Sequence, residues 1–288
     1  MTGAFSPIAP DAVVDSASPG RPYAEVIGDP ISHSKSPEIH GFWLEKLGID
    51  AQYRRCHVAP DALGEYIARR RDDADWRGCN VTIPHKLAVL DHVADPGGVR
   101  DGIGAANTIM RDPAGGLMAT NTDAGGFFAP LADADLAGRP VALIGAGGAA
   151  RAILFALSRM GVGPVTIFNR NPLKASALLA RFGLKGQALP LGAKLPAAAL
   201  LINSSPLGMA GQDALEIDLS PLPGDAIVYD IVYAPLITDL LAQADDRGLE
   251  TVDGLDMLVG QAALAFELFF GAEPPRDHDD ELRQRLVA

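Results

Sequence analysis

Cysteine is scarce in this sequence, and aromatic residues make up only 6% of it. The two cysteines, Cys56 and Cys79, belong to no CxxC pair and to no cluster with histidine. Two isolated thiols cannot form a disulfide framework, and they do not have the spacing of metal ligands. We therefore expect reduced core cysteines, no bound metal and a cytoplasmic protein.

An excess of positive charge is also absent. Lys and Arg number 24 against 36 Asp and Glu, a formal net charge of −12. This balance argues against nucleic acid or an anionic membrane as a partner. The most apolar stretch, residues 258–270, contains Gln261 and Glu267 and is too short to span a bilayer. Residues 1–22 do not have the pattern of a secretory signal and predict a flexible leader.

Hydrophobic residues are abundant, at 48% of the 288 residues. That is enough to fill two domains of roughly 100–200 residues each. Strand-like apolar runs alternate with helix-like ones, which predicts two α/β domains with parallel sheets.

A glycine turn stands at the centre of the second half. Four apolar residues, 141–144, precede Gly145-Ala146-Gly147-Gly148-Ala149-Ala150, and an alanine-rich helical run continues to Met160. This order fits the dinucleotide fingerprint G-x-G-x-x-A, in which the first glycine permits the turn and the second lets the backbone approach a pyrophosphate. An ordinary strand-to-helix turn fits the same glycines.

A second short strand, residues 165–168, follows about 20 residues later, where the fingerprint places the residue that contacts the ribose. The segment from Asn169 to Lys174 contains no carboxylate there. A carboxylate would accept the 2′-hydroxyl of NAD, whereas Arg170 and Lys174 suit a 2′-phosphate. The sequence therefore predicts NADP(H).

Serines follow the first predicted strand, residues 23–27. Ser36 fits either the N-cap of a helix that ends at Gly48 or a ligand contact. Ser34 lies in a polar loop at the carboxyl end of the strand, where open α/β sheets bind ligands. Further along, Arg69-Arg70-Arg71 stands beside three aspartates and is interpreted as a solvated surface.

Lys86 follows another predicted strand, residues 79–83, which Pro84 must end. A short helix is predicted from Leu87, so Lys86 falls in its first turn, where the helix dipole disfavours a cation. It is either a solvated lysine or a general acid or base. Asp123 fits an N-cap or a functional carboxylate. Gln261 is a polar exception in an apolar helical stripe and fits a ligand contact or a satisfied buried amide.

Nine segments in this order resemble those of the shikimate dehydrogenase family, and the resemblance covers nearly the whole chain from Gly28 to Gly271. They are residues 28–37, 78–86, 106–108, 121–123, 145–151, 169–170, 203–209, 229–233 and 253–261. The resemblance implies reversible, NADP-dependent interconversion of 3-dehydroshikimate and shikimate, a step of aromatic amino acid biosynthesis. Ala106, where valine is common, and Asn171-Pro172 after Arg170 depart from the family pattern.

The resemblance also implies roles for residues. Lys86 and Asp123 form the catalytic pair. Ser34 and Ser36 hold the substrate carboxylate, Asn80, Thr82, Asn107 and Gln261 hold its hydroxyls, and Tyr233 lies near the carboxylate or the nicotinamide. The cofactor residues are Gly145, Ala146, Gly147, Gly148, Ala149, Asn169, Arg170, Lys174, Ser204, Ile231 and Gly254.

We expect a discontinuous substrate domain, residues 23–122 plus 254–288, and a Rossmann-type NADP domain, residues 123–253, with a cleft between them. For the oligomeric state, a monomer and a homodimer are both compatible with the sequence. One alternative is an NAD-dependent quinate/shikimate dehydrogenase, against which the missing acid at 169–174 argues. Another is a non-catalytic metabolite sensor on the same fold, against which the joint presence of Lys86 and Asp123 argues.

Overall fold

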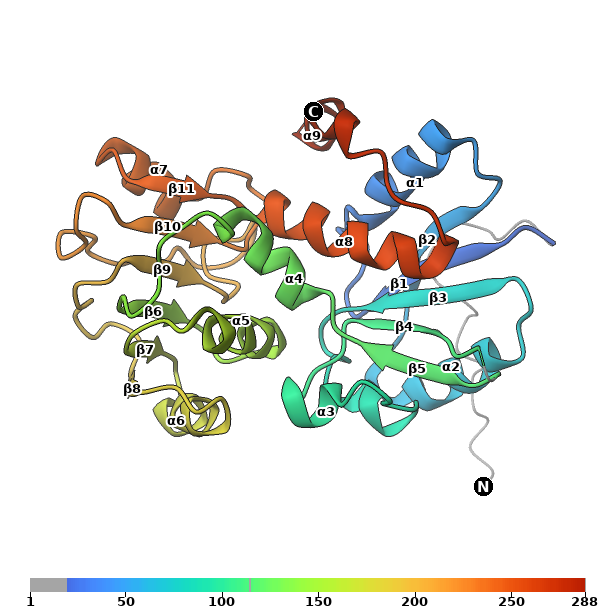
Figure 1. The fold of residues 1–288 in the computed structure, drawn as a ribbon, viewed down its shortest axis with the longest axis horizontal. Helices are drawn as coiled ribbons and strands as arrows, with labels where there is room; N and C mark the ends of the chain where they lie inside the picture. The colour runs from blue at the N-terminus through green and yellow to red at the C-terminus, as the bar shows by residue number, and fades with distance from the viewer. Residues whose placement is uncertain (1–19, 114, 288) are drawn as a thin grey trace, which may run out of the picture. The chain divides into compact units, whose positions relative to one another are not determined.

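The computed structural model describes residues 20–113 and 115–287 (Figure 1). Residues 1–19 of the predicted leader lie outside the described part of the chain. The contacts divide the chain into two units. Unit 1 comprises the described residues up to Asn121 together with Ala265–Leu286, and unit 2 comprises Thr122–Leu264. Helix α8 (Gly254–Phe270) begins in unit 2 and ends in unit 1, so the chain leaves unit 2 within a helix.

Unit 1 is built on a five-stranded sheet with the order β2-β1-β3-β4-β5. Strands β1, β2 and β3 are parallel, while β4 runs antiparallel to both β3 and β5. Strands β4 and β5 follow one another in the chain and pair as an antiparallel hairpin. The strands are β1 (Tyr23–Gly28), β2 (Gln52–His57), β3 (Trp76–Val81), β4 (Thr108–Arg111) and β5 (Leu117–Thr120).

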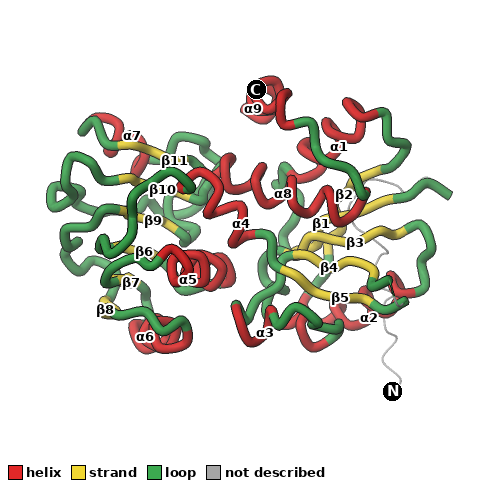
Figure 2. The backbone as a smooth tube through the Cα atoms, viewed as in Figure 1, coloured by secondary structure: helices red, strands yellow, loops and turns green. Residues whose placement is uncertain are grey.

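The helices of unit 1 (Figure 2) are α1 (Ser36–Leu47), α2 (Leu63–Arg71), α3 (Val99–Gly102) and α9 (Asp279–Val287), with short 3-10 turns at Pro60–Ala62, Ala88–Asp91 and Arg276–His278. Helix α1 buries one apolar face and ends at Gly48 with φ of 62°, as predicted. The N-cap interpretation of Ser36 is wrong. Lys35 occupies the cap position without a side-chain bond, and Ser36 is the first helical residue.

The segment around Lys86 also differs from the prediction. Strand β3 ends at Val81, before Thr82 and Ile83, and the predicted helix is a 3-10 turn confined to Ala88–Asp91. Lys86 precedes that turn and is half-buried. The argument from the dipole of an α-helix therefore does not apply to Lys86.

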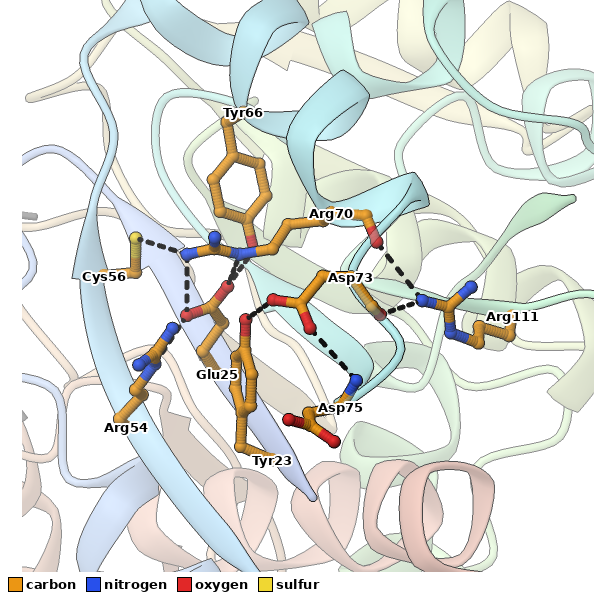
Figure 3. Close-up of polar contacts among 9 residues, drawn as sticks. All are labelled: Tyr23, Glu25, Arg54, Cys56, Tyr66, Arg70, Asp73, Asp75 and Arg111. Carbon is orange, nitrogen blue, oxygen red and sulfur yellow. Dashed lines mark hydrogen bonds and ion pairs between the residues drawn. The ribbon is translucent and has the colours of Figure 1, made fainter. Parts of the chain in front are cut away.

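The interpretation of Arg70 as a solvated residue is wrong as well. Its guanidinium donates to the carboxylate of Glu25, which is completely buried on β1 (Figure 3). The same carboxylate accepts hydrogen bonds from Arg54 on β2 and from the hydroxyl of Tyr66 on α2. A buried carboxylate must be paired to be tolerated, and this pairing ties α2 to the sheet.

Unit 2 is built on a six-stranded parallel sheet with the order β11-β10-β9-β6-β7-β8. Numbered from β6, this is the strand order of the Rossmann fold. The strands are β6 (Val141–Ile144), β7 (Val165–Phe168), β8 (Gly186–Leu189), β9 (Leu200–Asn203), β10 (Ile227–Asp230) and β11 (Glu250–Val252). The two outer strands, β8 and β11, were not predicted.

Helices α4 (Asp123–Phe128), α5 (Gly148–Met160), α6 (Pro172–Arg181) and α7 (Asp239–Asp246) belong to unit 2 with most of α8, and a 3-10 turn spans Ala129–Leu131. Successive residues of β6 belong to different cores: Val141 and Leu143 to one, Ala142 and Ile144 to the other. Alternating side chains of a strand point to opposite faces, so this sheet is covered on both faces.

Cys56 and Cys79 are both buried and unbridged, as expected. No helix in the described part of the chain has the length and apolar character needed to cross a membrane. Within residues 20–113 and 115–287, no three histidine, cysteine or acidic side chains gather in a way that could hold a metal ion.

Candidate active site

In unit 1, two loops meet at the carboxyl ends of β1 and β3. A Cβ on Gly28 would lie 2.6 Å from Thr82 Cγ2 and 2.9 Å from the carbonyl oxygen of Ile83, so glycine alone permits this approach. The backbone N–H of Asp29 donates to the Ile83 carbonyl at 3.0 Å. The serine loop after β1 is thereby joined to the loop that carries Thr82 and Lys86.

The serine loop is held from several directions. Ser34 and Ser36 are buried, and the Ser34 hydroxyl donates to the Ser36 hydroxyl at 3.3 Å. Arg55 on β2 donates to the Ser34 carbonyl at 2.9 and 2.6 Å. The two hydroxyls therefore form a fixed pair, which is what recognition of a carboxylate needs.

Lys86 and Asn107 lie in adjoining backbone segments. The carbonyl of Lys86 accepts from the N–H of Ala106 at 2.7 Å, and the carbonyl of Asn107 accepts from the N–H of Val81 at 2.7 Å. Asn107 is itself buried and immediately precedes β4. The sequence separates Lys86 from Asn107 by 21 positions, whereas the backbone bonds place their segments side by side.

A hydrogen-bonded relay connects two of the predicted substrate residues, Asn80 and Asn107. The Asn80 amide nitrogen donates to Thr108 Oγ1 at 3.2 Å, and the Thr108 hydroxyl donates to Asn107 Oδ1 at 3.0 Å. On its other side, Asn80 Oδ1 accepts from the hydroxyl of Tyr53 at 2.6 Å. These bonds fix the orientation of both amides, so each presents a defined donor and acceptor.

The ring of Tyr53 is fixed by His40. The two rings stack with centroids 3.9 Å apart and planes 4° from parallel. Burial lowers the pKa of His40 to about 3, so it is neutral at physiological pH, and burial raises the pKa of Tyr53 well above its ordinary value. Two neutral rings thus support the hydroxyl that orients Asn80. Sequence reasoning missed Tyr53 and Thr108 because their contacts join strands far apart in the chain.

We predict that Thr108→Val raises the KM for the substrate about tenfold, because it breaks both bonds of the relay without a large change in shape. Thr108→Ser keeps the hydroxyl and is the matched control. Steady-state kinetics with both substrates varied provide the measurement. An equal rise in the KM for the dinucleotide would contradict a role confined to the substrate residues.

In unit 2, the glycine turn meets the loop that follows β9. Gly145 has φ of 105°, and a Cβ there would lie 2.8 Å from Ser204 Oγ. Ser204 donates from its hydroxyl to the Ile144 carbonyl at 2.7 Å. β6 and β9 are neighbours at the point where the strand order reverses, which is where open α/β sheets bind dinucleotides.

The turn leaves room for a pyrophosphate. Gly147 is exposed, and among the described residues other than its two chain neighbours no atom lies within 4 Å of the position that a Cβ would take. Helix α5 begins at Gly148 without a side-chain cap, so its first N–H groups point into this space. Ala150 is completely buried against the sheet, as the fingerprint requires.

The end of β7 carries the predicted contacts to the ribose phosphate. Arg170 and Lys174 are exposed, and Lys174 lies in the first turn of α6, where an anion is favoured. The Asn171 side chain caps this helix by accepting from the Lys174 N–H at 3.3 Å. Asn169 in turn donates from its amide to the Asn171 carbonyl at 2.8 Å. Asn171, which departs from the family pattern, therefore serves as the N-cap of α6.

Ile231, Tyr233 and Gly254 gather near the end of β10. The N–H of Ile231 donates to the Asn203 carbonyl at 3.0 Å, and Tyr233 lies two residues further along the same loop. A Cβ on Gly254 would lie 2.5 Å from the carbonyl oxygens of Ile231 and Val232. The start of α8 thus packs directly on this loop.

Asp123 is buried and is the first residue of α4. The N-cap interpretation of Asp123 is wrong, because Thr122 occupies that position and no side chain caps the helix. Gln261 on α8 accepts from the Thr122 hydroxyl at 3.4 Å and donates to the Leu258 carbonyl at 2.9 Å. Gln261 is therefore a satisfied amide adjacent to the start of α4.

Three family models match the chain. Residues 26–109 match the shikimate dehydrogenase substrate binding domain, residues 129–205 match shikimate/quinate 5-dehydrogenase, and residues 254–279 match the shikimate 5′-dehydrogenase C-terminal domain. A curated protein of Sphingopyxis alaskensis named shikimate dehydrogenase (NADP(+)) is 67% identical over 267 residues, which cover 93% of this chain and 97% of that protein.

Solved structures agree with the fold. Shikimate 5-dehydrogenase from Thermus thermophilus, in complex with NADP(H) and shikimate, is 36% identical with a TM-score of 0.82 and covers 92% of this chain and 99% of its own. Quinate dehydrogenase from Corynebacterium glutamicum, in complex with NAD, is 29% identical with a TM-score of 0.81 and covers the same shares of the two chains.

Proposed function

Since this chain belongs to the shikimate dehydrogenase family, we propose that it catalyses the reversible, NADP-dependent reduction of 3-dehydroshikimate to shikimate. The observation that carries this proposal is the pair of half-sites. Unit 1 gathers hydroxyls, amides and Lys86 at one edge of its sheet, and unit 2 has a Rossmann crevice at Gly145. Residues 23–122 with 254–288 bind the substrate, and residues 123–253 bind NADP(H), in a cytoplasmic enzyme.

The residues of unit 2 suit NADP(H). The N–H groups that begin α5 hold the pyrophosphate, and Arg170 with Lys174 holds the 2′-phosphate. When bound, the cofactor supplies the hydride. Ser204, Ile231 and Gly254 border the nicotinamide half of the crevice.

Lys86 and Asp123 are the proposed catalytic pair. Hydride arrival at the carbonyl carbon places negative charge on the substrate oxygen, and the ammonium of Lys86 stabilises or protonates that oxygen. Asp123 orients the lysine. Ser34 and Ser36 hold the substrate carboxylate, while Asn80, Thr82, Asn107 and Gln261 hold the hydroxyls. Tyr233 borders the carboxylate or the nicotinamide.

An absorbance assay at the NADPH wavelength tests the proposal with shikimate and NADP⁺. Turnover supports it, and no turnover with this pair would contradict the proposed reaction. No turnover with quinate and NAD⁺ as well would leave a metabolite sensor as the better interpretation. The same assay with quinate and NAD⁺ separates the second candidate, an NAD-dependent quinate/shikimate dehydrogenase. A larger kcat/KM for NAD⁺ than for NADP⁺ would favour that candidate.

We predict that Arg170→Ala raises the KM for NADP⁺ between about ten- and a hundredfold, because a charge-assisted bond to the 2′-phosphate is lost. The KM for NAD⁺ should stay within twofold, since NAD⁺ has no such phosphate. Arg159→Ala, at an exposed arginine of α5, is the control. A parallel loss with both cofactors would mean that Arg170 does not contact the 2′-phosphate.

A further inference from the structure

A buried polar network joins the ends of β9 and β10. The last residues of these strands, Asn203 and Asp230, are cross-strand partners and are both completely buried. The Asn203 amide nitrogen donates to Asp230 Oδ1 at 3.0 Å and to the Leu207 carbonyl at 2.9 Å. Asn203 Oδ1 accepts from the N–H and the hydroxyl of Ser205 at 3.1 and 2.7 Å. This network fixes the loop that contains Ser204.

Asp230 extends the network into the next loop. Its Oδ1 also accepts from the N–H of Val232 at 3.0 Å, and its Oδ2 accepts from the hydroxyl of Thr238 at 2.8 Å. The Thr238 hydroxyl in turn accepts from the Leu241 N–H at 3.3 Å as the N-cap of α7. The carboxylate therefore holds both ends of residues 231–238, the loop that contains Ile231 and Tyr233.

The two loops are also joined to each other. The N–H of Ala210 donates to the Ala234 carbonyl at 2.7 Å, and the N–H of Ile231 donates to the Asn203 carbonyl at 3.0 Å. Gly254 fits against the second loop without space for a side chain. Asp230 is thus linked by hydrogen bonds to the loop that contains Ile231 and Tyr233, whereas Arg170 follows a different strand, β7.

We propose that Asp230 is a positioning residue that holds residues 231–238 in the shape that receives the nicotinamide half of NADP(H). The inference rests on the proposed NADP-dependent activity and extends it. Asp230 is assigned no contact with the substrate or the cofactor. It acts through the backbone at Val232 and through Thr238.

The buried carboxylate of Asp230 destabilises the folded protein when it is ionised, which favours a functional role for this residue over a stabilising one. Burial raises the pKa of Asp230 to about 6. The hydrogen bonds from Val232, Thr238 and Asn203, which are uncharged donors, lower the pKa but do not outweigh the burial. A folded-state pKa above the ordinary value means that the ionised form costs stability above pH 6. That cost is relieved as the pH falls from about 6 toward the ordinary value of about 4.

Asp230→Asn is the first test. The new side chain can still accept from Val232 and Asn203, but its amide nitrogen faces the Thr238 hydroxyl and cannot accept from it. Loss of one charged hydrogen bond should weaken NADPH binding about tenfold, measured by fluorescence titration at pH 8. Binding of 2′,5′-ADP, which lacks the nicotinamide half, should stay within twofold by calorimetry. The melting temperature at pH 8 should not fall.

Thr238→Val removes the hydroxyl that donates to Asp230 and therefore breaks the same hydrogen bond. It is the test variant if Asp230→Asn does not fold. Thr238→Ser keeps the link and should behave as wild type. The NADPH dissociation constant of the wild type, divided by that of Asp230→Asn at the same pH, should rise below pH 6 as the Asp230 carboxylate becomes protonated. Because both proteins bind the same ligand, the titration of its 2′-phosphate cancels in this ratio.

An unchanged NADPH affinity in both variants, or equal weakening of both ligands, would overturn the positioning role of Asp230. A wild-type protein that binds 2′,5′-ADP and NADPH but does not oxidise shikimate would instead contradict the proposed function. In that case the binding comparison between variants still decides the role of Asp230.

Discussion

Replacing Lys86 with alanine should lower kcat for shikimate oxidation by about a hundred- to ten-thousandfold, the usual contribution of a general acid or base. Lys86 is expected to face the oxygen that becomes negatively charged when hydride is transferred, and no other group is assigned to protonate it. The dissociation constant for NADPH should change less than twofold, because the cofactor residues belong to unit 2 and Lys86 belongs to unit 1. Stopped-flow turnover and fluorescence titration measure the two quantities.

Lys86→Arg separates two roles of the lysine. Arginine keeps a positive charge, but its pKa above about 12 prevents it from giving up a proton. Recovery of most of the activity would assign Lys86 to electrostatic stabilisation, and no recovery would favour proton transfer or the exact placement of an ammonium. Lys46→Ala, on helix α1 of the same unit, should leave kcat unchanged.

The pair with Asp123 is tested by the double variant. If Lys86 and Asp123 act as one unit, the double change to Lys86→Ala with Asp123→Asn should cost little more than Lys86→Ala alone. Costs that multiply would show that the two residues act independently. Equal loss of kcat and of NADPH affinity in Lys86→Ala would contradict the catalytic assignment itself.

The sequence predicted the parts of the fold that have local signals. The glycine turn at Gly145 has a fixed sequence pattern, and helix α1 ends at a glycine that adopts the left-handed conformation. The predicted strand at residues 165–168 is β7 without change. Strands β8 and β11 escaped prediction because they are short, lie at the two edges of the sheet and expose half or more of their residues.

For the candidate site too, the sequence predicted the residues that lie in recognisable segments and not the residues that orient them. Ser34, Lys86 and Asp123 stand in recognisable segments, whereas the groups that orient such residues come from elsewhere in the chain. Tyr53 lies 27 residues from the Asn80 it contacts, and no pattern in β2 indicates that pairing. Arg70 looked solvated because charged neighbours surround it in sequence, and only the packing of α2 on β1 brings it to Glu25.

Replacing Glu25 with glutamine should lower the free energy of unfolding of unit 1 by about 3–5 kcal/mol, the typical cost of removing one partner from a buried ion pair. The Glu25 side chain is 0% exposed, and those of Arg54 and Arg70 are 10% and 11% exposed, so solvent cannot replace the lost carboxylate. Glutamine keeps the shape but leaves two guanidinium groups facing a neutral amide, whose nitrogen is one more donor.

The neighbouring carboxylate of Asp73 cannot compensate. Burial opposes its ionisation, but the Tyr23 hydroxyl, donating at 2.5 Å, and two backbone bonds outweigh this and lower its pKa, so the Asp73 carboxylate is already engaged by other donors (Figure 3). The Asp73 carbonyl oxygen is likewise committed to the Arg111 guanidinium. No second carboxylate in this cluster therefore takes the place of Glu25 beside the two guanidinium groups.

Urea unfolding followed by tryptophan fluorescence measures this loss directly, because both tryptophans of the chain, Trp43 and Trp76, are buried in unit 1. Glu65→Gln is the matched control on α2, where Glu65 forms an exposed pair with Arg69 at 3.9 Å. An exposed pair of this kind contributes less than about 1 kcal/mol. If both variants unfold at the same urea concentration, the buried cluster does not stabilise unit 1 in the way that its geometry indicates.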